Sequence, residues 1–106
     1  MKIIVQSFCL KALSYFHHYS MTNKNSWFVY MVLCSDNSLY TGVTTDLKRR
    51  IHEHNYTLKG ARYTRIRRPV KLVFSSSASS RSDACKQEYR IKQLSPEKKR
   101  MLAKNE

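Results

Sequence analysis

Cysteines are few in this sequence, and none of them is placed to form a recognisable site. The three cysteines, Cys9, Cys34 and Cys85, lie far apart, and no Cys-x-x-Cys pair occurs. This spacing indicates neither a zinc site nor a framework of disulfides, because both need cysteines at characteristic separations. A chain without disulfides suits a reducing compartment, so we expect a cytoplasmic protein.

The sequence also lacks a long apolar run. No stretch approaches the roughly 20 apolar residues that cross a bilayer, so no membrane partner is expected. The apolar start of the chain is interrupted by Gln6 and Lys11, and no small-residue cleavage site follows, which argues against a signal peptide. We expect residues 1–25 to be an N-terminal extension, flexible or not translated, with translation starting at Met21. The rest of the 106-residue chain is expected to form one monomeric domain, residues 26–104.

Acidic residues are scarce. The chain has 7 Asp and Glu against 20 Lys and Arg, and its net charge of +13 predicts a polyanionic partner. Between Lys48 and Lys71, nine basic residues accompany a single acid, Glu53. Interleaved tyrosines suit a phosphate backbone with an occasional stacked base, although a solvated basic loop is the alternative interpretation. The candidate nucleic-acid-binding residues are Lys59, Arg62, Tyr63, Arg65, Arg67 and Arg68.

Two short segments predict a β-hairpin that carries two tyrosines. Trp27–Cys34 is apolar, aromatic and β-branched, as in a buried strand, and Leu39–Thr44 is the expected returning strand. If the turn contains an odd number of residues, Tyr30 and Tyr40 share one face of the sheet, because side chains alternate with a period of two. Gly42 lies inside the second strand, where glycine usually marks a bulge or a close approach of another group.

A helix is predicted directly after the hairpin. Thr44 or Thr45 is the expected N-cap, Asp46 lies in the first turn, and the helix should end near Asn55. Arg50 and His54 are four residues apart, so they lie on one flank of this helix, beside its apolar stripe. A cation at the edge of a buried face is placed to contact a bound group.

The sequence of the second half of the domain predicts one more strand and two helices. Val70–Phe74 is the expected third strand, begun by Pro69, which cannot donate to a ladder. The serine-rich residues 75–80 are expected to form a loop, and Ser82 or Asp83 should cap the helix that follows.

Glu88 falls on the inward face of that helix. The inward stripe, at helical spacing, consists of Ala84, Glu88, Ile91 and Leu94 or Ser95. A carboxylate on such a face is costly unless it is paired, hydrogen-bonded or bound to a metal. Ser95 as N-cap and Pro96 at the first helical position should then start a final helix. The expected fold is therefore a small α/β (α+β) domain with a three-stranded, mainly antiparallel sheet flanked by helices, in the order β-β-α-β-α-α.

Taken together, these segments resemble the GIY-YIG nuclease superfamily. The two signature strands correspond to Phe28-Val29-Tyr30 and Tyr40-Thr41-Gly42, and the helix arginine to Arg50. The resemblance is closest to the small, stand-alone bacterial branch and covers roughly residues 26–104. Two departures are visible: the strands read Phe-Val-Tyr and Tyr-Thr-Gly, and Val43 stands where several family enzymes carry a lysine.

The resemblance implies a metal-dependent phosphodiesterase that acts on nucleic acid, and it assigns roles to five side chains. Glu88 would be the protein ligand of one Mg²⁺ or Mn²⁺, and Arg50 would hold the scissile phosphate. Tyr40 is the first choice for activating the water, with Tyr30 orienting it. His54 is the fallback base, since histidine titrates near neutral pH.

Less specific interpretations remain open for the same residues. Tyr30 and Tyr40 could be ordinary sheet tyrosines, and Glu88 could merely pair with Arg50. We expect an endonuclease that cuts single-stranded or branched DNA with little sequence specificity, in DNA repair or processing. The alternatives are an inert nucleic-acid-binding module or a subunit that needs a protein partner, and no residue is evidently placed to sense a 2′-hydroxyl of RNA.

Overall fold

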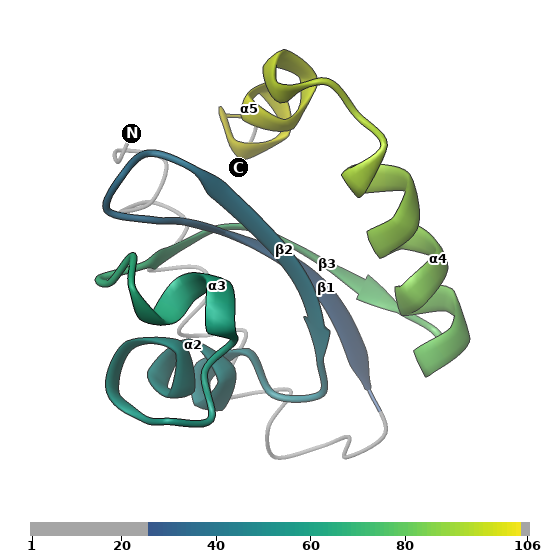
Figure 1. Cartoon of the computed structure of the whole chain (residues 1–106). Coiled ribbons are helices and arrows are strands. Elements are labelled where there is room, and N and C mark those ends of the chain that lie inside the picture. Colours follow the sequence, from purple (N-terminus) through teal and green to yellow (C-terminus); the bar gives the residue numbers. More distant parts are fainter. Residues whose placement is uncertain (1–25, 105–106) are drawn as a thin grey trace.

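Three antiparallel strands form the centre of the computed structural model, which describes residues 26–104 (Figure 1). The strand order is β2-β1-β3, so β1 lies in the middle and pairs with both neighbours. The elements in chain order are β1 (Trp27–Leu33), β2 (Leu39–Thr44), α2 (Leu47–Tyr56), α3 (Arg62–Arg65), β3 (Lys71–Ala78), α4 (Arg81–Lys92) and α5 (Pro96–Lys104). The predicted fold class and order are confirmed, and α3 is an additional short helix in the stretch predicted as a basic loop. The expectations for residues 1–25, including a start at Met21, lie outside the described residues.

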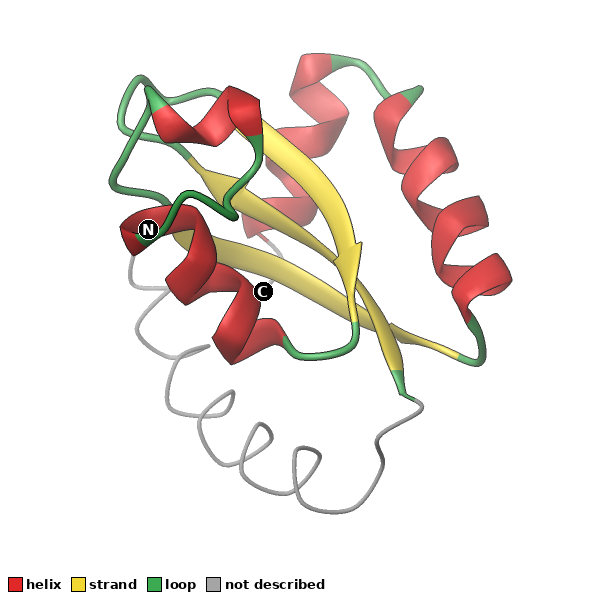
Figure 2. Cartoon of the chain, turned by 60° about the horizontal axis from the view of Figure 1, so that its bottom comes forward, coloured by secondary structure: helices red, strands yellow, loops and turns green. Residues whose placement is uncertain are grey.

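Helices cover both faces of the sheet, which explains the continuous apolar sequence of β1 (Figure 2). The side chains of Phe28, Tyr30 and Val32 pack in a cluster with Leu47 of α2. The side chains between them point the other way and pack in a second cluster. That cluster buries Val29, Met31, Val73 and Ile91. Because both faces of the central strand are buried, neither can be polar. No helix within residues 26–104 is long and apolar enough to span a membrane.

The β1–β2 connection has the geometry that places the two tyrosines together. Leu33 pairs with Leu39, so residues 34–38 form the turn, and their number is odd as the prediction required. Asn37 adopts the left-handed conformation (φ 70°), which asparagine tolerates better than most residues. Asp36 and Asn37 both lie in this turn, which suits residue types that favour turns.

Gly42 lies opposite Tyr30 in the sheet, and the tyrosine ring occupies the space where a side chain would be. A Cβ atom built on Gly42 would approach Tyr30 Oη to 2.6 Å and Cζ to 2.8 Å. The backbone of Gly42 does not have a positive φ. Glycine is thus needed here for space and not for its conformational freedom.

The third strand is longer than the sequence predicted. The expectation of a loop over residues 75–80 is wrong for the first four of these residues, because β3 continues to Ala78. Serine has little strand preference of its own, but Ser75 pairs with Tyr30 and Ser77 with Phe28 in the ladder to β1. Pairing with a buried neighbour outweighs local preference in a strand.

Two helix starts also differ from the predicted ones by a few residues. Asp46, not Thr44 or Thr45, is the N-cap of α2, and its Oδ1 accepts a hydrogen bond from the Arg49 amide at 3.0 Å. Thr44 Oγ1 instead accepts from the Asp46 amide at 3.1 Å. The threonine therefore holds the residue before the helix, and the aspartate satisfies a free amide inside it.

The N-cap of α4 is Ser80, not Ser82 or Asp83. The Asp83 amide donates to Ser80 Oγ at 3.0 Å, and the Asp83 carboxylate accepts from the Ser79 amide at 3.0 Å. The Ser80 hydroxyl and the Asp83 carboxylate thus each accept from a backbone amide at the start of α4. The predicted cap of α5 is confirmed by a hydrogen bond from the Lys98 amide to Ser95 Oγ at 3.2 Å.

The C-terminal end of α2 is attached to the strand that follows it. The side chain of Asn55 donates to the Val70 carbonyl at 2.9 Å and accepts from the Val70 amide at 2.7 Å. Arg68 Nε donates to the His54 carbonyl at 2.6 Å, and its NH2 group donates to the Thr57 carbonyl. A guanidinium at a helix C-terminus satisfies free carbonyls and suits the helix dipole. These contacts fix α2 against the sheet.

The close approach of Tyr30 to Gly42 predicts a specific cost for a side chain at that position. Gly42→Ala should lower the free energy of unfolding by about 1–3 kcal/mol, because a Cβ overpacks a site already filled by the tyrosine ring. Urea denaturation measures the change. In a Tyr30→Phe background the cost should be smaller, since the nearest atom is absent. An equal cost in both backgrounds would contradict this explanation.

Candidate active site

Tyr30 and Tyr40 lie on the same face of the sheet, as predicted, but in different surroundings. Tyr40 pairs with Val32 and Tyr30 with Gly42, and both tyrosines belong to the cluster beneath α2. Tyr30 is 1% exposed, whereas Tyr40 is only half-buried. The two phenols therefore differ in their access to solvent and to any bound molecule.

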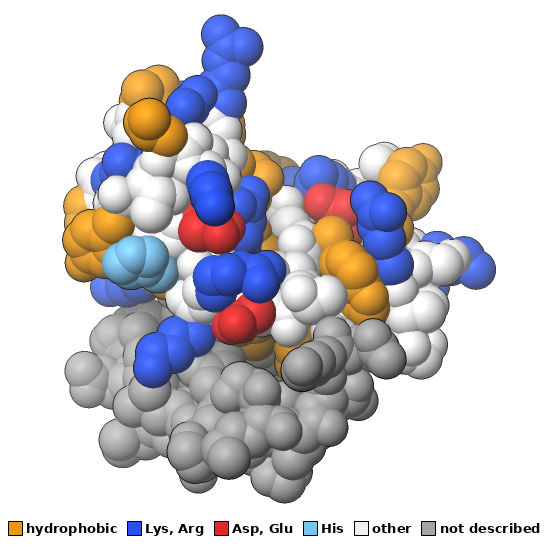
Figure 3. Space-filling model, turned by 90° about the horizontal axis from the view of Figure 1, so that it is seen from below, with side chains coloured by type: hydrophobic (Ala, Val, Ile, Leu, Met, Phe, Trp, Pro, Cys, Tyr) orange, Lys and Arg blue, Asp and Glu red, His pale blue; other side chains and the backbone are white. Residues whose placement is uncertain are grey.

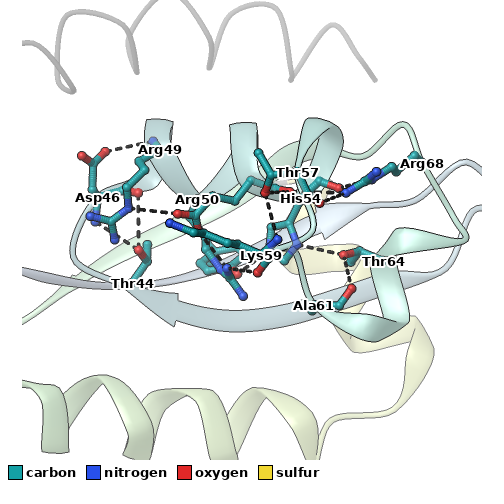
Figure 4. A network of polar contacts seen from close by, with 12 residues as sticks. Thr44, Asp46, Arg49, Arg50, His54, Thr57, Lys59, Ala61, Thr64 and Arg68 are labelled. Atoms are coloured by element: carbon teal, nitrogen blue, oxygen red, sulfur yellow. Dashed lines mark hydrogen bonds and ion pairs between the residues drawn. The ribbon is translucent and has the colours of Figure 1, made fainter.

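A chain of buried hydrogen bonds connects Tyr30 through His54 to α3. Tyr30 Oη lies 2.7 Å from His54 Nε2, and His54 Nδ1 lies 2.9 Å from Thr64 Oγ1. Thr64 Oγ1 donates its own proton to the Ala61 carbonyl at 2.9 Å, so it accepts from His54 Nδ1. His54 Nε2 is then unprotonated, and Tyr30 donates to it. Figure 4 shows the part of this chain from His54 to Ala61.

Burial shifts the pKa values of both buried partners away from neutrality. Loss of solvent raises the pKa of Tyr30 to about 12, although the nearby Arg50 guanidinium opposes the shift. Burial is also the main reason that the pKa of His54 is lowered to about 4, and the charge of Arg50 adds to it. Both groups are therefore neutral at pH 7.

Arg50 is held at the edge of this cluster by two acceptors. Its NH1 group donates to Glu53 Oε1 at 2.8 Å and to the Lys59 carbonyl at 2.9 Å (Figure 4). Burial acts to lower the pKa of Arg50, but its bonds to Glu53 and Tyr30 outweigh burial and raise it. The guanidinium is 23% exposed. One edge of its planar fork is thus bound by the protein, and donors remain for a phosphate.

Gly60 allows the loop after α2 to supply one of those acceptors. A Cβ on Gly60 would lie 2.7 Å from the Glu53 carbonyl oxygen and 2.9 Å from His54 Cα. Glycine therefore lets the loop backbone lie directly on the helix, so that the Lys59 carbonyl reaches Arg50. Glu53 was missed as a site residue from sequence, although it is the single acid of the basic stretch and lies three residues after Arg50.

The Tyr40 ring is held by other rings. It stacks on Tyr63 of α3 with ring centroids 6.0 Å apart and an interplanar angle of 19°. The His54 ring meets it edge-on at 5.4 Å. Within residues 26–104 the Tyr40 hydroxyl has no hydrogen-bond partner. Residues 26–104 therefore leave the Tyr40 hydroxyl without a partner, while they engage that of Tyr30.

Glu88 lies on α4, the helix that buries Ala84 and Ile91 against the sheet. Its carboxylate is 23% exposed and forms an ion pair with Lys92 at 3.0 Å, not with Arg50. The charge of Glu88 contributes least among the effects that shift the pKa of Tyr30, which it raises. The helix that carries Glu88 packs against the face of the sheet opposite to the cluster of Tyr30 and Tyr40.

Besides Tyr63, which stacks on Tyr40, the predicted nucleic-acid-binding residues separate into two groups. Arg67 and Arg68 are half-buried, and their guanidinium groups donate to protein acceptors. Lys59, Arg62 and Arg65 are exposed, and we call them the basic surface. Lys and Arg side chains outnumber acidic ones on the face seen in Figure 3.

Comparison with known proteins identifies the family of this chain. A family model described as the GIY-YIG catalytic domain matches residues 26–101. The chain belongs to the GIY-YIG nuclease superfamily. A UPF0213 protein of Desulfotalea psychrophila is 59% identical over 83 residues, covering 78% of this chain and 76% of the relative. A UPF0213 protein of Bacillus velezensis is 52% identical over 75 residues, covering 71% and 75%.

Two solution NMR structures are similar to this GIY-YIG domain. A UPF0213 protein from Bacillus halodurans matches with a TM-score of 0.50 and 43% identity, covering 76% of this chain and 85% of that one. A protein from E. faecalis matches with a TM-score of 0.54 and 41% identity, covering 78% and 88%. The superfamily consists of DNA nucleases that generally depend on a divalent metal ion, so the general class of this chain is nuclease.

The side chains of this GIY-YIG domain suit a hard divalent cation. Among the described residues, no group of three or more His, Cys, Asp or Glu side chains could enclose a metal ion. A structural zinc site needs such a group. Mg²⁺ instead retains several waters and binds through one or two carboxylates and the substrate phosphate. Glu88, half-buried and paired within the described part of the chain with the exposed Lys92, fits this second pattern.

Burial of neutral His54 predicts a pH-dependent stability. Between pH 6.5 and about 4 the unfolded chain binds a proton at His54 that the folded chain does not. The free energy of unfolding should therefore fall as the pH is lowered from 7 to 5, by up to about 1.4 kcal/mol per pH unit. Urea denaturation across this range measures the slope.

His54→Gln should flatten that slope whatever its effect on stability at pH 7. His52→Gln is the matched control, because His52 lies two residues away on the same helix and is exposed. A slope that survives His54→Gln, or disappears in His52→Gln, would contradict the assignment.

Proposed function

We propose that this protein is a divalent-metal-dependent endonuclease that hydrolyses DNA phosphodiester bonds. The observation that carries the proposal is the difference between its two tyrosines. The Tyr30 hydroxyl donates to His54, while the Tyr40 hydroxyl, on the same face, has no hydrogen-bond partner in the described chain. A reactive phenol needs an unoccupied hydroxyl, and a supporting phenol needs a fixed one.

Tyr40 would receive the proton of the attacking water. Its ring is held from two sides by Tyr63 and His54, so its hydroxyl points from a fixed position. An ordinary tyrosine has a pKa near 10, and positive charge nearby favours the ionised form. His54, the alternative base considered from sequence, is neutral, and both its ring nitrogens are engaged. This arrangement supports a positioning role for His54.

Arg50 would bind the scissile phosphate. Its anchoring by Glu53 and the Lys59 carbonyl fixes the guanidinium plane before substrate arrives. Donors that are already oriented stabilise the charge that builds on the phosphate oxygens without further reorganisation. A lysine offers a point charge and cannot reproduce this fork.

Glu88 would hold the divalent ion. When bound, the ion supplies positive charge that stabilises the leaving oxygen. The ion pair with the exposed Lys92 is screened by solvent, so a divalent cation would readily replace the lysine as the partner of Glu88.

The surroundings of the basic surface support a preference for single-stranded or branched DNA. Tyr56, Leu58 and Ile66 are 75%, 85% and 82% exposed and lie in the same stretch of chain as Lys59, Arg62 and Arg65. Unpaired bases can pack on exposed aromatic and apolar groups, while cations follow the backbone. Phosphate and stacking contacts carry little sequence information, which supports weak sequence specificity. A role in DNA repair or processing would follow from such selectivity.

Cleavage of end-labelled single-stranded, duplex and branched DNA tests the proposal. We expect cutting with Mg²⁺ or Mn²⁺, none with EDTA, and a loss of about 100-fold or more in Arg50→Ala. Arg49→Ala is the matched control, because Arg49 is 54% exposed and lies one position away. Binding without cutting by the wild type would favour an inert or partner-dependent module.

The proposed role of Glu88 separates cleavage from binding. Glu88→Gln should abolish metal-supported cleavage but keep DNA affinity and its salt dependence, since Glu88 contacts no phosphate directly. Glu97→Gln, which removes an exposed acid from α5, should retain cleavage. Full cleavage by Glu88→Gln would remove Glu88 from the mechanism.

A further inference from the structure

Tyr63 and Arg67 form a stack against Tyr40, the proposed base. The Tyr63 ring lies against the Tyr40 ring, and the Arg67 guanidinium carbon lies 3.9 Å from the Tyr63 centroid. A guanidinium at this distance over an aromatic ring is attracted by the charge distribution of the ring. The order Tyr40, Tyr63, Arg67 thus connects β2, α3 and the segment after α3 in a single set of contacts.

The stack is anchored on the turn between β1 and β2. Arg67 Nε donates to Asp36 Oδ2 at 3.0 Å, and Arg67 NH1 donates to the Tyr63 carbonyl at 2.9 Å. The Ser35 amide also donates to the Arg67 carbonyl at 2.9 Å. Side chain and backbone of Arg67 are therefore both fixed to the hairpin that carries Tyr40.

The orientation of the Tyr40 side chain depends on this stack more than that of Tyr30 does. The Tyr30 ring is enclosed, and its hydroxyl is held by His54. The Tyr40 ring is half-buried with a hydroxyl that no described group holds, so its orientation rests on the rings around it. Removing Tyr63 would remove the stacked ring and leave the edge contact with His54 and the packing against the cluster beneath α2. A displacement of about 1 Å is costly for a group that acts on an attacking water.

We propose that Tyr63 and Arg67 are positioning residues for Tyr40, and that they do not serve as nucleic-acid contacts. The inference rests on the proposed function, because it concerns the group assigned as base. It also revises the sequence-based expectation, which placed both residues among the basic, nucleic-acid-binding stretch. The ring of Tyr63 contacts both Arg67 and Tyr40, and the Arg67 guanidinium donates to Asp36 and to the Tyr63 carbonyl, so both side chains are held against the hairpin that carries Tyr40.

Steady-state cleavage of single-stranded DNA by three variants tests the inference. Tyr63→Leu should lower kcat by about ten-fold or more with KM within about two-fold, because only the orientation of the base changes. Tyr63→Phe keeps the ring and should restore kcat. Arg67→Lys keeps the charge but loses the planar fork, and should also lower kcat.

Arg65→Ala is the contrasting variant from the same short helix. Arg65 is exposed and stacks on no ring within residues 26–104, so its loss should raise KM and reduce the salt slope of binding by about one, with kcat kept. If Tyr63→Leu or Arg67→Lys showed that pattern, the two residues would be nucleic-acid contacts and the inference would be overturned. Unchanged kcat and KM would overturn it as well.

A structural readout keeps the inference separate from the proposed function. The aromatic NMR signals of Tyr40 should move in Tyr63→Leu, because the ring current of the stacked partner is lost, and should stay in place in Arg65→Ala. Tyr63 is 39% exposed, so these variants are expected to fold, and their thermal unfolding checks this. Unmoved Tyr40 signals would overturn the stack. Absence of cleavage by the wild type would refute the proposed function and leave the stack to be decided by NMR alone.

Discussion

The hydrogen bond from Tyr30 to His54 organises much of this protein, because it joins the central strand to the helix above it. To reach His54, the Tyr30 ring crosses the neighbouring strand at a place where only glycine leaves room. His54 must be neutral to accept the bond, and its second nitrogen then binds Thr64 of α3. The buried Tyr30 side chain therefore requires glycine at position 42 and a neutral His54, and through His54 it connects α2 and α3 to the sheet. Arg50, one turn before His54, is placed at the rim by the same docking.

The positive charge of the chain is divided between internal and external uses. Arg50, Arg67 and Arg68 donate to carbonyl and carboxylate oxygens of the protein, where a rigid fork satisfies several acceptors at once. Lys59 and Arg65 extend into solvent. Glu53 offsets some of the repulsion within the basic stretch and orients Arg50 as it does so. An arginine in a basic run is therefore not automatically a nucleic-acid contact, because its planar group is also well suited to capping a helix or covering a ring.

The predictions from sequence succeeded where a pattern is local and failed where a distant partner decides. The hairpin follows from the local strand pattern, and the shared face of Tyr30 and Tyr40 follows from strand periodicity on the condition, met in the structure, that the turn has an odd number of residues. The strand over Ser75–Ala78 was missed because its stability comes from pairing with β1. The caps of α2 and α4 were misplaced by a few residues, since several adjacent Ser, Thr and Asp side chains could each have served. Glu53 was missed because a charged residue on a helix surface is most often only solvated.

By itself, the sequence determined the order of strands and helices along the chain, the family and the candidate side chains. These properties depend on short-range spacing and residue type. It also determined that the domain would be strongly basic. Only the tertiary structure decided which tyrosine is engaged and which is available, which arginines are internal, and where Tyr63 lies. Those properties depend on burial and on contacts between residues distant in the chain, such as Asp36 with Arg67 and Tyr40 with Tyr63. No local pattern can specify them, because each requires two surfaces that come together only when α2 and α3 fold onto the sheet.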